Sequence, residues 1–251
     1  KNLRFKTVYG ISYGASEYRA YTPKYQFTPQ TANTVSKVNQ SHGHGLSMVW
    51  TNTLSYDFNI ATEHHVNALI GSELSTYDGS NTEGSNTGLI PGFDDWDHAY
   101  LVNTNGTENK TVKGSPYDST RGMSYFARLG WTWKERYMVN ATMRADGSSK
   151  FAKGNRWGYF PSVSAGWTIS EEKFMESVKS WFDFLKIRVS WGQVGNANIN
   201  CYQYLAPVST TNTNYNFGSG GGQDAWVTGS YTSRLANEKV KWETSEQYNV
   251  G

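Results

Sequence analysis

The fold is decided by the stretch YFARLGWTW (residues 125–133), KER (134–136) and YMVNATMRA (137–145). Every second residue on either side of KER is apolar or aromatic. The residues between them are mostly polar, and Phe126 and Met138 are the exceptions. A period of two is typical of a β-strand with one apolar and one polar face. The stretch therefore predicts two strands joined by a tight turn.

The same alternation recurs along the chain, which predicts about eight strands in all. The further segments are residues 3–14, 48–60, 66–74, 163–169, 185–191 and a last one that begins near Val240. These segments exceed the roughly 5–6 residues of a usual globular strand and suit the roughly 9–11 residues of a tilted membrane strand. Two architectures fit: a soluble β-sandwich with the apolar faces inside, or a membrane barrel with the apolar faces toward lipid.

Connections and aromatic residues favour the barrel. Long expected loops at 15–47, 76–120 and after residue 193 alternate with short ones at 61–65 and 134–136. Outer-membrane barrels show this alternation, with short periplasmic turns and long outer loops. Aromatic side chains also gather at both strand ends, as they do at the two membrane interfaces. These are Trp131, Trp133 and Tyr137 near the turn, and Trp157, Tyr159 and Phe160 at the other end.

A short helix is expected in the connection 170–184, at the periplasmic end of the barrel. Ser170 is a candidate cap, and two glutamates follow it, as at many helix starts. An apolar stripe at helical spacing follows, formed by Phe174, Val178 and Trp181. An amphipathic helix on the surface of any other domain would carry the same pattern.

Composition excludes several classes of protein. The 251 residues carry a net charge of only +2, so no nucleic-acid partner is expected. Aromatic residues make up 15% of the chain, which argues against disorder. No enzyme motif is present, so we expect no catalytic residue and no cofactor. Two histidine pairs and one acidic cluster lack the spacing of a known metal site: His42 with His44, His64 with His65, and Asp94, Asp95 and Asp97.

One run of linked motifs resembles the barrel of the SusC/RagA family of TonB-linked outer-membrane transporters. It begins with RADGSSKF (144–151) and NRWGYFPS (155–162), continues with AGWTISEE (165–172) and LKIRVSWGQ (185–193), and is followed by Gly195 and Asn196. A later WET segment (242–244) is similar to the next family motif. The motif tip around Asp146 and Ser148 is expected to be structural, because Gly, Asp and Ser favour turns.

The resemblance implies a fold and a function. Residues 1–251 would be part of the β-barrel domain of a TonB-dependent receptor, with the plug and N-terminal region outside the given sequence. The receptor would import an oligosaccharide or peptide across the bacterial outer membrane, in contact with outer-membrane lipid. It would draw energy through TonB and work with a SusD-like surface lipoprotein. The alternatives are a passive porin or adhesin barrel, and a soluble carbohydrate-binding β-sandwich.

Two groups of residues are candidates for the site. The charged residues on the polar parity should point into the lumen, to meet the plug or a polar solute or simply to be solvated: Arg128, Arg144, Lys186 and Arg188. Aromatic faces stack on sugar rings and peptide side chains, so four aromatics of the expected outer loops are predicted to bind substrate. These are Trp96, Tyr100, Tyr215 and Trp226, and packing within the loops is the alternative.

Overall fold

The computed structural model describes residues 2–116, 119–178, 183–210, 213–216 and 226–251. Its main element is one 9-stranded sheet, with eight long strands in the order β1-β4-β5-β7-β8-β9-β10-β15 and with β6 paired to β5. This confirms the all-β prediction and the expected strands. Their bounds are β1 Leu3–Thr22, β4 Lys37–Ile60, β5 His64–Thr87, β6 Thr111–Pro116, β7 Thr120–Trp133, β8 Tyr137–Ser148, β9 Trp157–Thr168, β10 Lys186–Asn196 and β15 Glu243–Val250.

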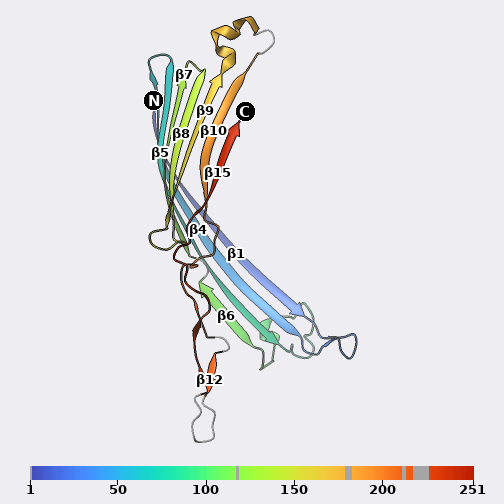
Figure 1. Cartoon of the computed structure of the whole chain (residues 1–251). Coiled ribbons are helices and arrows are strands. Elements are labelled where there is room, and N and C mark those ends of the chain that lie inside the picture. Colours follow the sequence, from blue (N-terminus) through green and yellow to red (C-terminus); the bar gives the residue numbers. More distant parts are fainter. Residues whose placement is uncertain (1, 117–118, 179–182, 211–212, 217–225) are drawn as a thin grey trace. The chain divides into compact units, whose positions relative to one another are not determined.

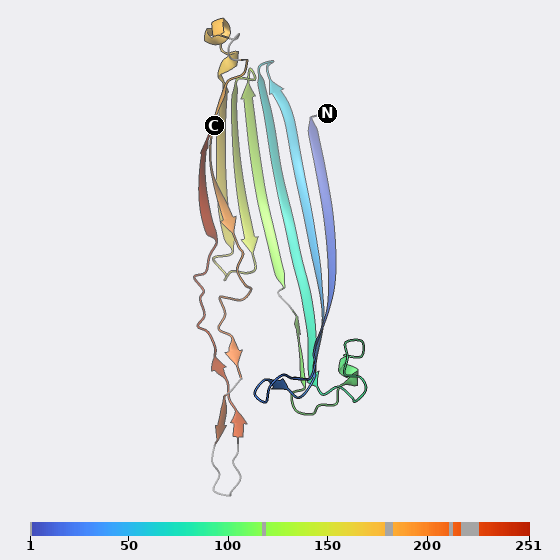
Figure 2. The same ribbon diagram turned by 90° about the vertical axis from the view of Figure 1, so that its right-hand side faces the viewer.

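The chain forms two compact units. Unit 1 comprises Lys1–Val8, Trp50–Leu74 and Arg121–Gly251, and unit 2 comprises Tyr9–Val49 and Ser75–Thr120. In unit 1 the strands from β7 to β10, followed by β15, lie side by side in both views (Figures 1 and 2). Narrow hairpin pairs join β11 (Val208–Ser209) to β14 (Tyr231–Thr232), and β12 (Asn214–Asn216) to β13 (Trp226–Thr228).

Antiparallel register aligns the apolar residues of unit 1 across its strands. Leu129 of β7 lies opposite Ala141 of β8, which lies opposite Val163 of β9, which in turn lies opposite Trp191 of β10. Because side chains alternate between the two faces of a strand, this register brings all four onto one face of the sheet. The predicted alternation thus becomes a continuous apolar surface.

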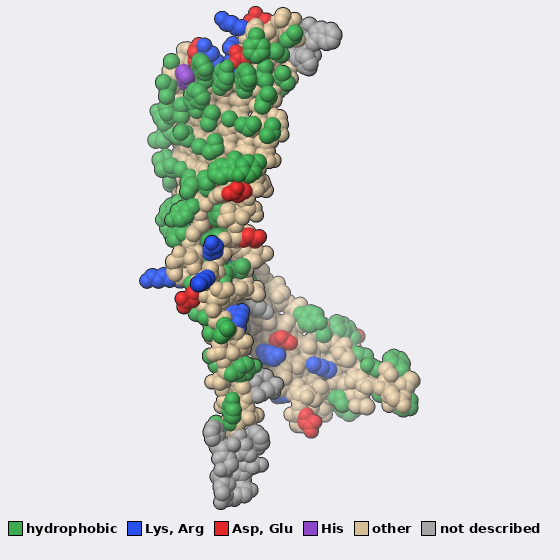
Figure 3. Space-filling view, viewed as in Figure 1, with side chains coloured by type: hydrophobic (Ala, Val, Ile, Leu, Met, Phe, Trp, Pro, Cys, Tyr) green, Lys and Arg blue, Asp and Glu red, His purple; other side chains and the backbone are tan. Residues whose placement is uncertain are grey.

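Within the described residues, no second layer covers this apolar surface. Leu129 is 53% exposed, Ile187 44% and Val189 45%. Figure 3 shows hydrophobic side chains spread over the face of unit 1 that it displays, with charged ones gathered near the strand ends. Among the residues that the structure describes, only seven hydrophobic side chains are buried. A soluble sandwich would bury such a surface, so that alternative is wrong for this chain.

Three strands are longer than predicted, which corrects the expected loops. β1 continues to Thr22, β4 begins at Lys37, and β5 continues to Thr87. Much of the expected loops 15–47 and 76–120 is therefore strand, and β2 (Tyr25–Gln26), β3 (Ala32–Asn33) and the 3-10 helix η1 (Leu101–Asn103) occupy part of the rest. The prediction failed because polar side chains interrupt the apolar parity of these extensions: Glu17 and Arg19 in β1, Gln40, His42 and His44 in β4, and Thr76, Asp78 and Ser80 in β5.

The turn predicted at residues 134–136 is confirmed. Lys134 and Glu135 have φ values of 51° and 56°, and the Arg136 amide donates to the Trp133 carbonyl at 2.9 Å. Positive φ at both central residues marks a type I′ turn, whose twist matches that of the strands it joins. The chain therefore reverses here through two strained non-glycine residues.

The helix predicted after residue 170 is present in a different form. It consists of two 3-10 helices, η2 (Ile169–Glu171) and η3 (Lys173–Val178). Ser170 is buried inside η2 and is not its cap, and the cap residue Thr168 makes no side-chain hydrogen bond there. Trp181 of the predicted stripe lies outside the described residues. No described helix is long and apolar enough to cross a membrane.

Candidate functional site

The polar face of unit 1 carries an ion-pair cluster centred on Arg144 of β8. Its Nε lies 2.7 and 2.9 Å from the two carboxylate oxygens of Asp146, and its Nη2 lies 3.5 Å from Glu73 of β5. The same Nη2 donates to Ser124 of β7 at 3.2 Å, and the Thr51 hydroxyl of β4 donates to Glu73 at 3.1 Å. One arginine thus links side chains from β4, β5, β7 and β8.

Phe126, an exception to the polar pattern, fills space over a glycine. A Cβ on Gly71 of the neighbouring strand would stand 2.4 Å from the Phe126 ring. The ring therefore occupies the place that a side chain of β5 would take. The Arg144 guanidinium lies 5.6 Å from the ring centroid, within cation–π distance. An aromatic side chain that covers a glycine on the next strand is a known way to stabilise a sheet.

The other three predicted lumen charges, Arg128, Lys186 and Arg188, lie on the same parity and have no ion-pair partner in the described part of the chain. The Lys186 Nζ lies 3.1 Å from the sulfur of Met138, the second exception to the polar pattern. Lys186 and Arg188 border a cavity of about 400 Å³ whose wall also carries Asn140, Ser164 and Ser190. These cations can accept an anionic partner, whereas the charge of Arg144 is already compensated.

The linked motifs form a small aromatic core. Phe151 is fully buried and Phe160 is 7% exposed. The ring of Trp242 lies 5.3 Å from that of Phe151 and 5.4 Å from that of Phe160. The Trp242 Nε1 donates to the Arg156 carbonyl at 2.9 Å. A Cβ on Gly195 of β10 would stand 2.0 Å from the Phe160 ring, so this glycine makes room for it. The rings of the motif therefore pack on one another, which supports a structural role.

A band of stacked rings crosses four strands near the turns 61–63 and 134–136. His64 stacks on Trp133 at 5.8 Å, Trp133 on Tyr137 at 5.3 Å, and Tyr137 on Trp167 at 6.2 Å. The polar atoms of the rings point at carboxylates: Trp133 donates to Glu63 at 3.4 Å, while Tyr137 and Trp167 donate to Glu172 at 2.5 and 3.1 Å. Rings with one apolar body and one polar tip suit a membrane–water interface.

Hydrogen bonds favour the ionised form of the two carboxylates of this band. Hydrogen bonds from Lys134 and then Trp133 lower the pKa of Glu63. Hydrogen bonds from Tyr137 and then Trp167, with the nearby charge of Arg136, lower the pKa of Glu172. A second band lies at the other end of the strands, where Tyr125 stacks on Trp157 at 6.1 Å. Both predicted aromatic bands are present in unit 1, but Phe160 does not belong to the second one. It lies opposite Arg144 of β8, on the polar face, and is 7% exposed.

Comparison with known proteins decides the family. A family model described as "TonB dependent receptor-like, beta-barrel" matches residues 1–251. The chain belongs to the TonB-dependent receptors. It is of the SusC/RagA type predicted from the linked motifs, and it is 41% identical over 132 residues to TonB-dependent receptor SusC of Bacteroides thetaiotaomicron. That match covers 51% of this chain and 12% of SusC.

Other relatives extend the match along the chain. TonB-dependent receptor P39 of Formosa agariphila is 29% identical over 260 aligned positions, which cover 99% of this chain and 22% of P39. The structure of the RagAB peptide importer in its closed-closed state matches with a TM-score of 0.80 at 23% identity, over 100% of this chain and 26% of that chain. This last likeness shows the fold.

The chain spans between 12% and 22% of the length of the curated TonB-dependent receptors it matches. Receptors of this family are outer-membrane transporters rather than enzymes, so the chain is an outer-membrane segment. The apolar surface of unit 1 is accordingly its lipid face, and the surface with Arg144 and Arg188 faces the lumen.

Two predicted loop aromatics of this receptor lie together in unit 2. Trp96 and Tyr100 both pack on the guanidinium of Arg19, at 4.5 and 4.2 Å from the ring centroids. Each ring stays partly exposed, and Arg19 Nη1 is buried without a hydrogen-bond partner among the described residues. The loop is held by a small core of Val38, Leu89 and Ala99. Trp96 and Tyr100 therefore lie together over Arg19, and their contact with substrate stays a prediction.

The other two predicted aromatics lie in the connection between β10 and β15, residues 197–242. Tyr215 of β12 is exposed, and its ring covers Gly229, where a Cβ would stand 2.4 Å away. Trp226 belongs to β13 and pairs with Asn216 in the ladder. The glycine-rich run 218–222 lies outside the described residues. The side chain of Trp226 lies outside the described part of the chain, so the role of both aromatics in substrate binding stays a prediction.

The acidic loop of the receptor is engaged in local bonds. Asp94 accepts from the Tyr21 hydroxyl at 3.2 Å and pairs with Lys24 at 3.3 Å. Asp95 accepts from His98, whose hydrogen bonds lower the pKa of this carboxyl. Among the described residues, no group of three or more His, Cys, Asp or Glu side chains is placed to hold a metal ion.

The partners of these residues were not predicted. Arg144 was expected on the lumen face, but its bond to Glu73 joins two strands that are far apart in the sequence. The packing of Phe126 on Gly71 and of Phe160 on Gly195 was also not expected. A usable signal existed: each pair joins an aromatic residue out of pattern with a glycine on a strand expected to lie nearby.

Proposed function

We propose that residues 1–251 are part of the β-barrel domain of an outer-membrane receptor that actively imports a large nutrient, an oligosaccharide or a peptide. A plug domain would couple it to TonB, and a SusD-like surface lipoprotein would be its partner. Support comes from family membership together with the likeness to SusC and to RagAB, a peptide importer. The observation that carries the proposal is a single-layer sheet with an uncovered apolar face and a charged polar face.

Within this function, the unpaired cations are our candidates for lumen contacts. Lys186 and Arg188 border a polar cavity and lack a carboxylate partner among the described residues. An arginine in a partly desolvated lumen favours carboxylate groups, which it binds through two parallel hydrogen bonds. They would meet an acidic side chain of the plug or an anionic group of the nutrient. Trp96 and Tyr100 are our candidates for substrate contact on unit 2.

The test is uptake by cells that carry the complete receptor as their sole route for a labelled nutrient. We expect uptake of either an oligosaccharide or a peptide library to stop when the receptor is deleted and when an uncoupler collapses the proton gradient. We also expect a surface lipoprotein to copurify. Uptake that continues unchanged under the uncoupler would overturn active import and favour the passive porin.

A matched pair of variants tests the lumen assignment. Arg188→Gln removes an unpaired lumen cation, whereas Arg4→Gln removes a cation of the polar parity on β1 that lies outside the cavity. We expect the first to lower uptake several-fold with unchanged receptor levels, and the second to leave uptake close to wild type. Equal uptake in both variants would remove Arg188 from the site and leave the import proposal intact.

A further inference from the structure

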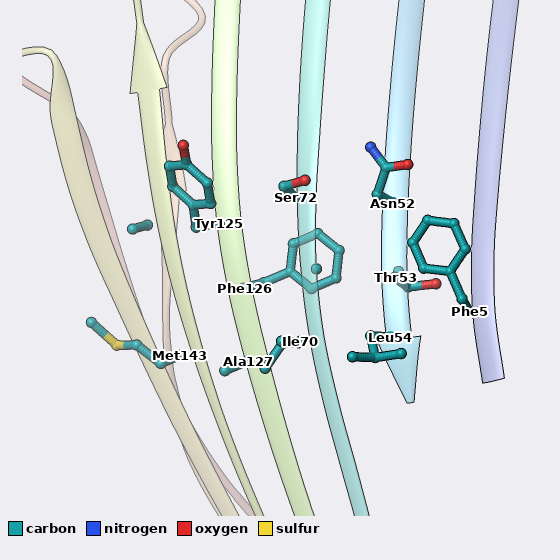
Figure 4. A pocket seen from close by; sticks show the side chains of 12 residues that line it. Phe5, Asn52, Thr53, Leu54, Ile70, Ser72, Tyr125, Phe126, Ala127 and Met143 are labelled. Atoms are coloured by element: carbon teal, nitrogen blue, oxygen red, sulfur yellow. The ribbon is translucent and has the colours of Figure 1, made fainter. Parts of the chain in front are cut away.

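A groove of about 510 Å³ lies on the lipid face of unit 1 (Figure 4). Its larger lipid-face wall residues are Phe5, Leu54, Ile70, Tyr125 and Met143, and the side chains of Ala127 and Ala145 are short. All of these residues lie on the apolar parity of their strands. The groove is thus a gap in the lipid-facing surface, open to the acyl chains that surround it.

Two polar side chains interrupt the apolar surface inside this groove. Asn52 lies on β4 between Trp50 and Leu54, and Ser72 lies on the neighbouring β5. Both occupy the parity that faces lipid, and Figure 4 shows them on adjacent strands, with Phe5 on one side and Tyr125 on the other. Neither side chain has a hydrogen-bond partner among the residues that the structure describes. A polar group that faces hydrocarbon without a partner is costly.

The depth of the groove indicates which partner could satisfy them. Tyr125, at its wall, stacks on Trp157 in the aromatic band opposite the 134–136 turn. Across the sheet Tyr125 lies opposite Ala145, and Ala145 lies opposite Tyr159 of the same band. Aromatic bands lie at the headgroup level of a bilayer. Asn52 and Ser72 therefore lie close to the depth at which acyl chains join their headgroups through ester or amide carbonyls.

We propose that this groove binds one acyl chain of an outer-leaflet glycolipid of the lipid A type. The chain lies between Phe5 and Met143, over Ala127. Its ester or amide carbonyl accepts hydrogen bonds from Asn52 Nδ2 and Ser72 Oγ. A lipid is favoured over a second protein face because Asn52 and Ser72 lie at the depth where a lipid carries its ester or amide carbonyl. The inference uses that placement and does not depend on what the receptor imports.

The experiment uses the complete receptor, stripped of lipid in detergent and then titrated with purified lipid A. Native mass spectrometry counts the bound lipids and gives their affinity. Ala127→Trp on β7 fills the groove. Ala141→Trp on β8 adds the same bulk to the same face of the sheet, but Ala141 lies opposite Leu129, outside the groove. We expect wild type and Ala141→Trp to hold one tight lipid A and Ala127→Trp to lose it.

A second variant keeps the groove open and tests its polar end. Asn52→Leu should weaken the tight site about tenfold while circular dichroism shows an unchanged barrel. The proposal is overturned if Ala127→Trp binds lipid A as wild type does, or if phosphatidylethanolamine occupies the groove with the same affinity. It is also overturned if Ala127→Trp changes only the oligomeric state, since a second copy would then be the occupant. Uptake that persists in all variants separates this result from the import proposal.

Discussion

In the strands around Leu129, large apolar side chains stand uncovered, whereas around Phe151, at the far end of the neighbouring strands, they are almost fully buried. Leu129 is 53% exposed and Phe151 is 0% exposed. The first region faces hydrocarbon, so its apolar side chains need no protein partner. The second region lies beyond the aromatic band and has to build its own core.

The difference teaches where family resemblance is encoded in this chain. The lipid face tolerates any apolar residue of suitable parity, so its sequence carries a period but little identity. The core of Phe151, Phe160 and Trp242 needs particular rings in contact with particular glycines. The part of the family motifs around Phe151 and Phe160 therefore locks strand ends together, and there it is a structural signature before it is a functional one.

The largest effect should come from Phe160→Ala. Phe160 is 7% exposed and contacts Trp242. Emptying a buried aromatic site costs about 3–5 kcal/mol, and this ring also covers Gly195 of β10. Hydrogen exchange of the β10 amides in the complete receptor measures the opening free energy. The neighbouring Tyr159→Ala, which removes a 61% exposed ring on the lipid face, is the control. If hydrogen exchange of the β10 amides accelerated equally in both variants, the two regions would not differ as described.

Gly195→Ala should disturb the same core from the other side. The added methyl group would meet the Phe160 ring at 2.0 Å, and that ring has no free space to enter. Overpacking of this kind costs about 1–3 kcal/mol. Gly14→Ala on β1 is the matched control, because a methyl group there would meet no atom within 4 Å. Hydrogen exchange of the β10 amides should accelerate only in Gly195→Ala. Unchanged exchange in Gly195→Ala would show that the core has room for the added methyl group.

Much of the sheet could be predicted from the sequence, and the reason is local. Period-two alternation depends on neighbouring residues, so residues 125–133 and 137–145 indicated their strands, turn and faces correctly. The extensions of β1, β4 and β5 lack an apolar face, and their ladders could not be predicted. The site was predicted less well, because the bond of Arg144 to Glu73 and the packing of Trp96 and Tyr100 on Arg19 join strands and loops through long-range pairing that no local pattern records.

On the lumen face, Arg144→Gln should have a smaller effect than either core variant. The substitution leaves the carboxylates of Glu73 and Asp146 without their shared cation. Partly exposed ion pairs contribute up to about 1 kcal/mol and weaken as salt increases. Urea unfolding of the complete receptor at low and high salt should show a loss that shrinks at high salt. Arg188→Gln, which breaks no ion pair with a described residue, should show no such salt-dependent loss.

The smallest effect concerns the aromatic band near the turns, which joins the lipid face to water. The pKa of Glu172 is lowered by the hydrogen bonds from Tyr137 and Trp167, so its ionised form is the one that the folded band favours. A carboxylate with a lowered folded-state pKa contributes stability above its ordinary pKa and loses it as the pH falls through the lowered value. In a pH titration, the fluorescence of Trp167 should therefore change only as the pH falls below the ordinary pKa of a glutamate. Glu172→Gln should remove that change. Glu171→Gln is the control on η2, since that carboxylate makes no hydrogen bond with the described residues. An acid transition that survives in Glu172→Gln would mean that the band is held by ring stacking alone.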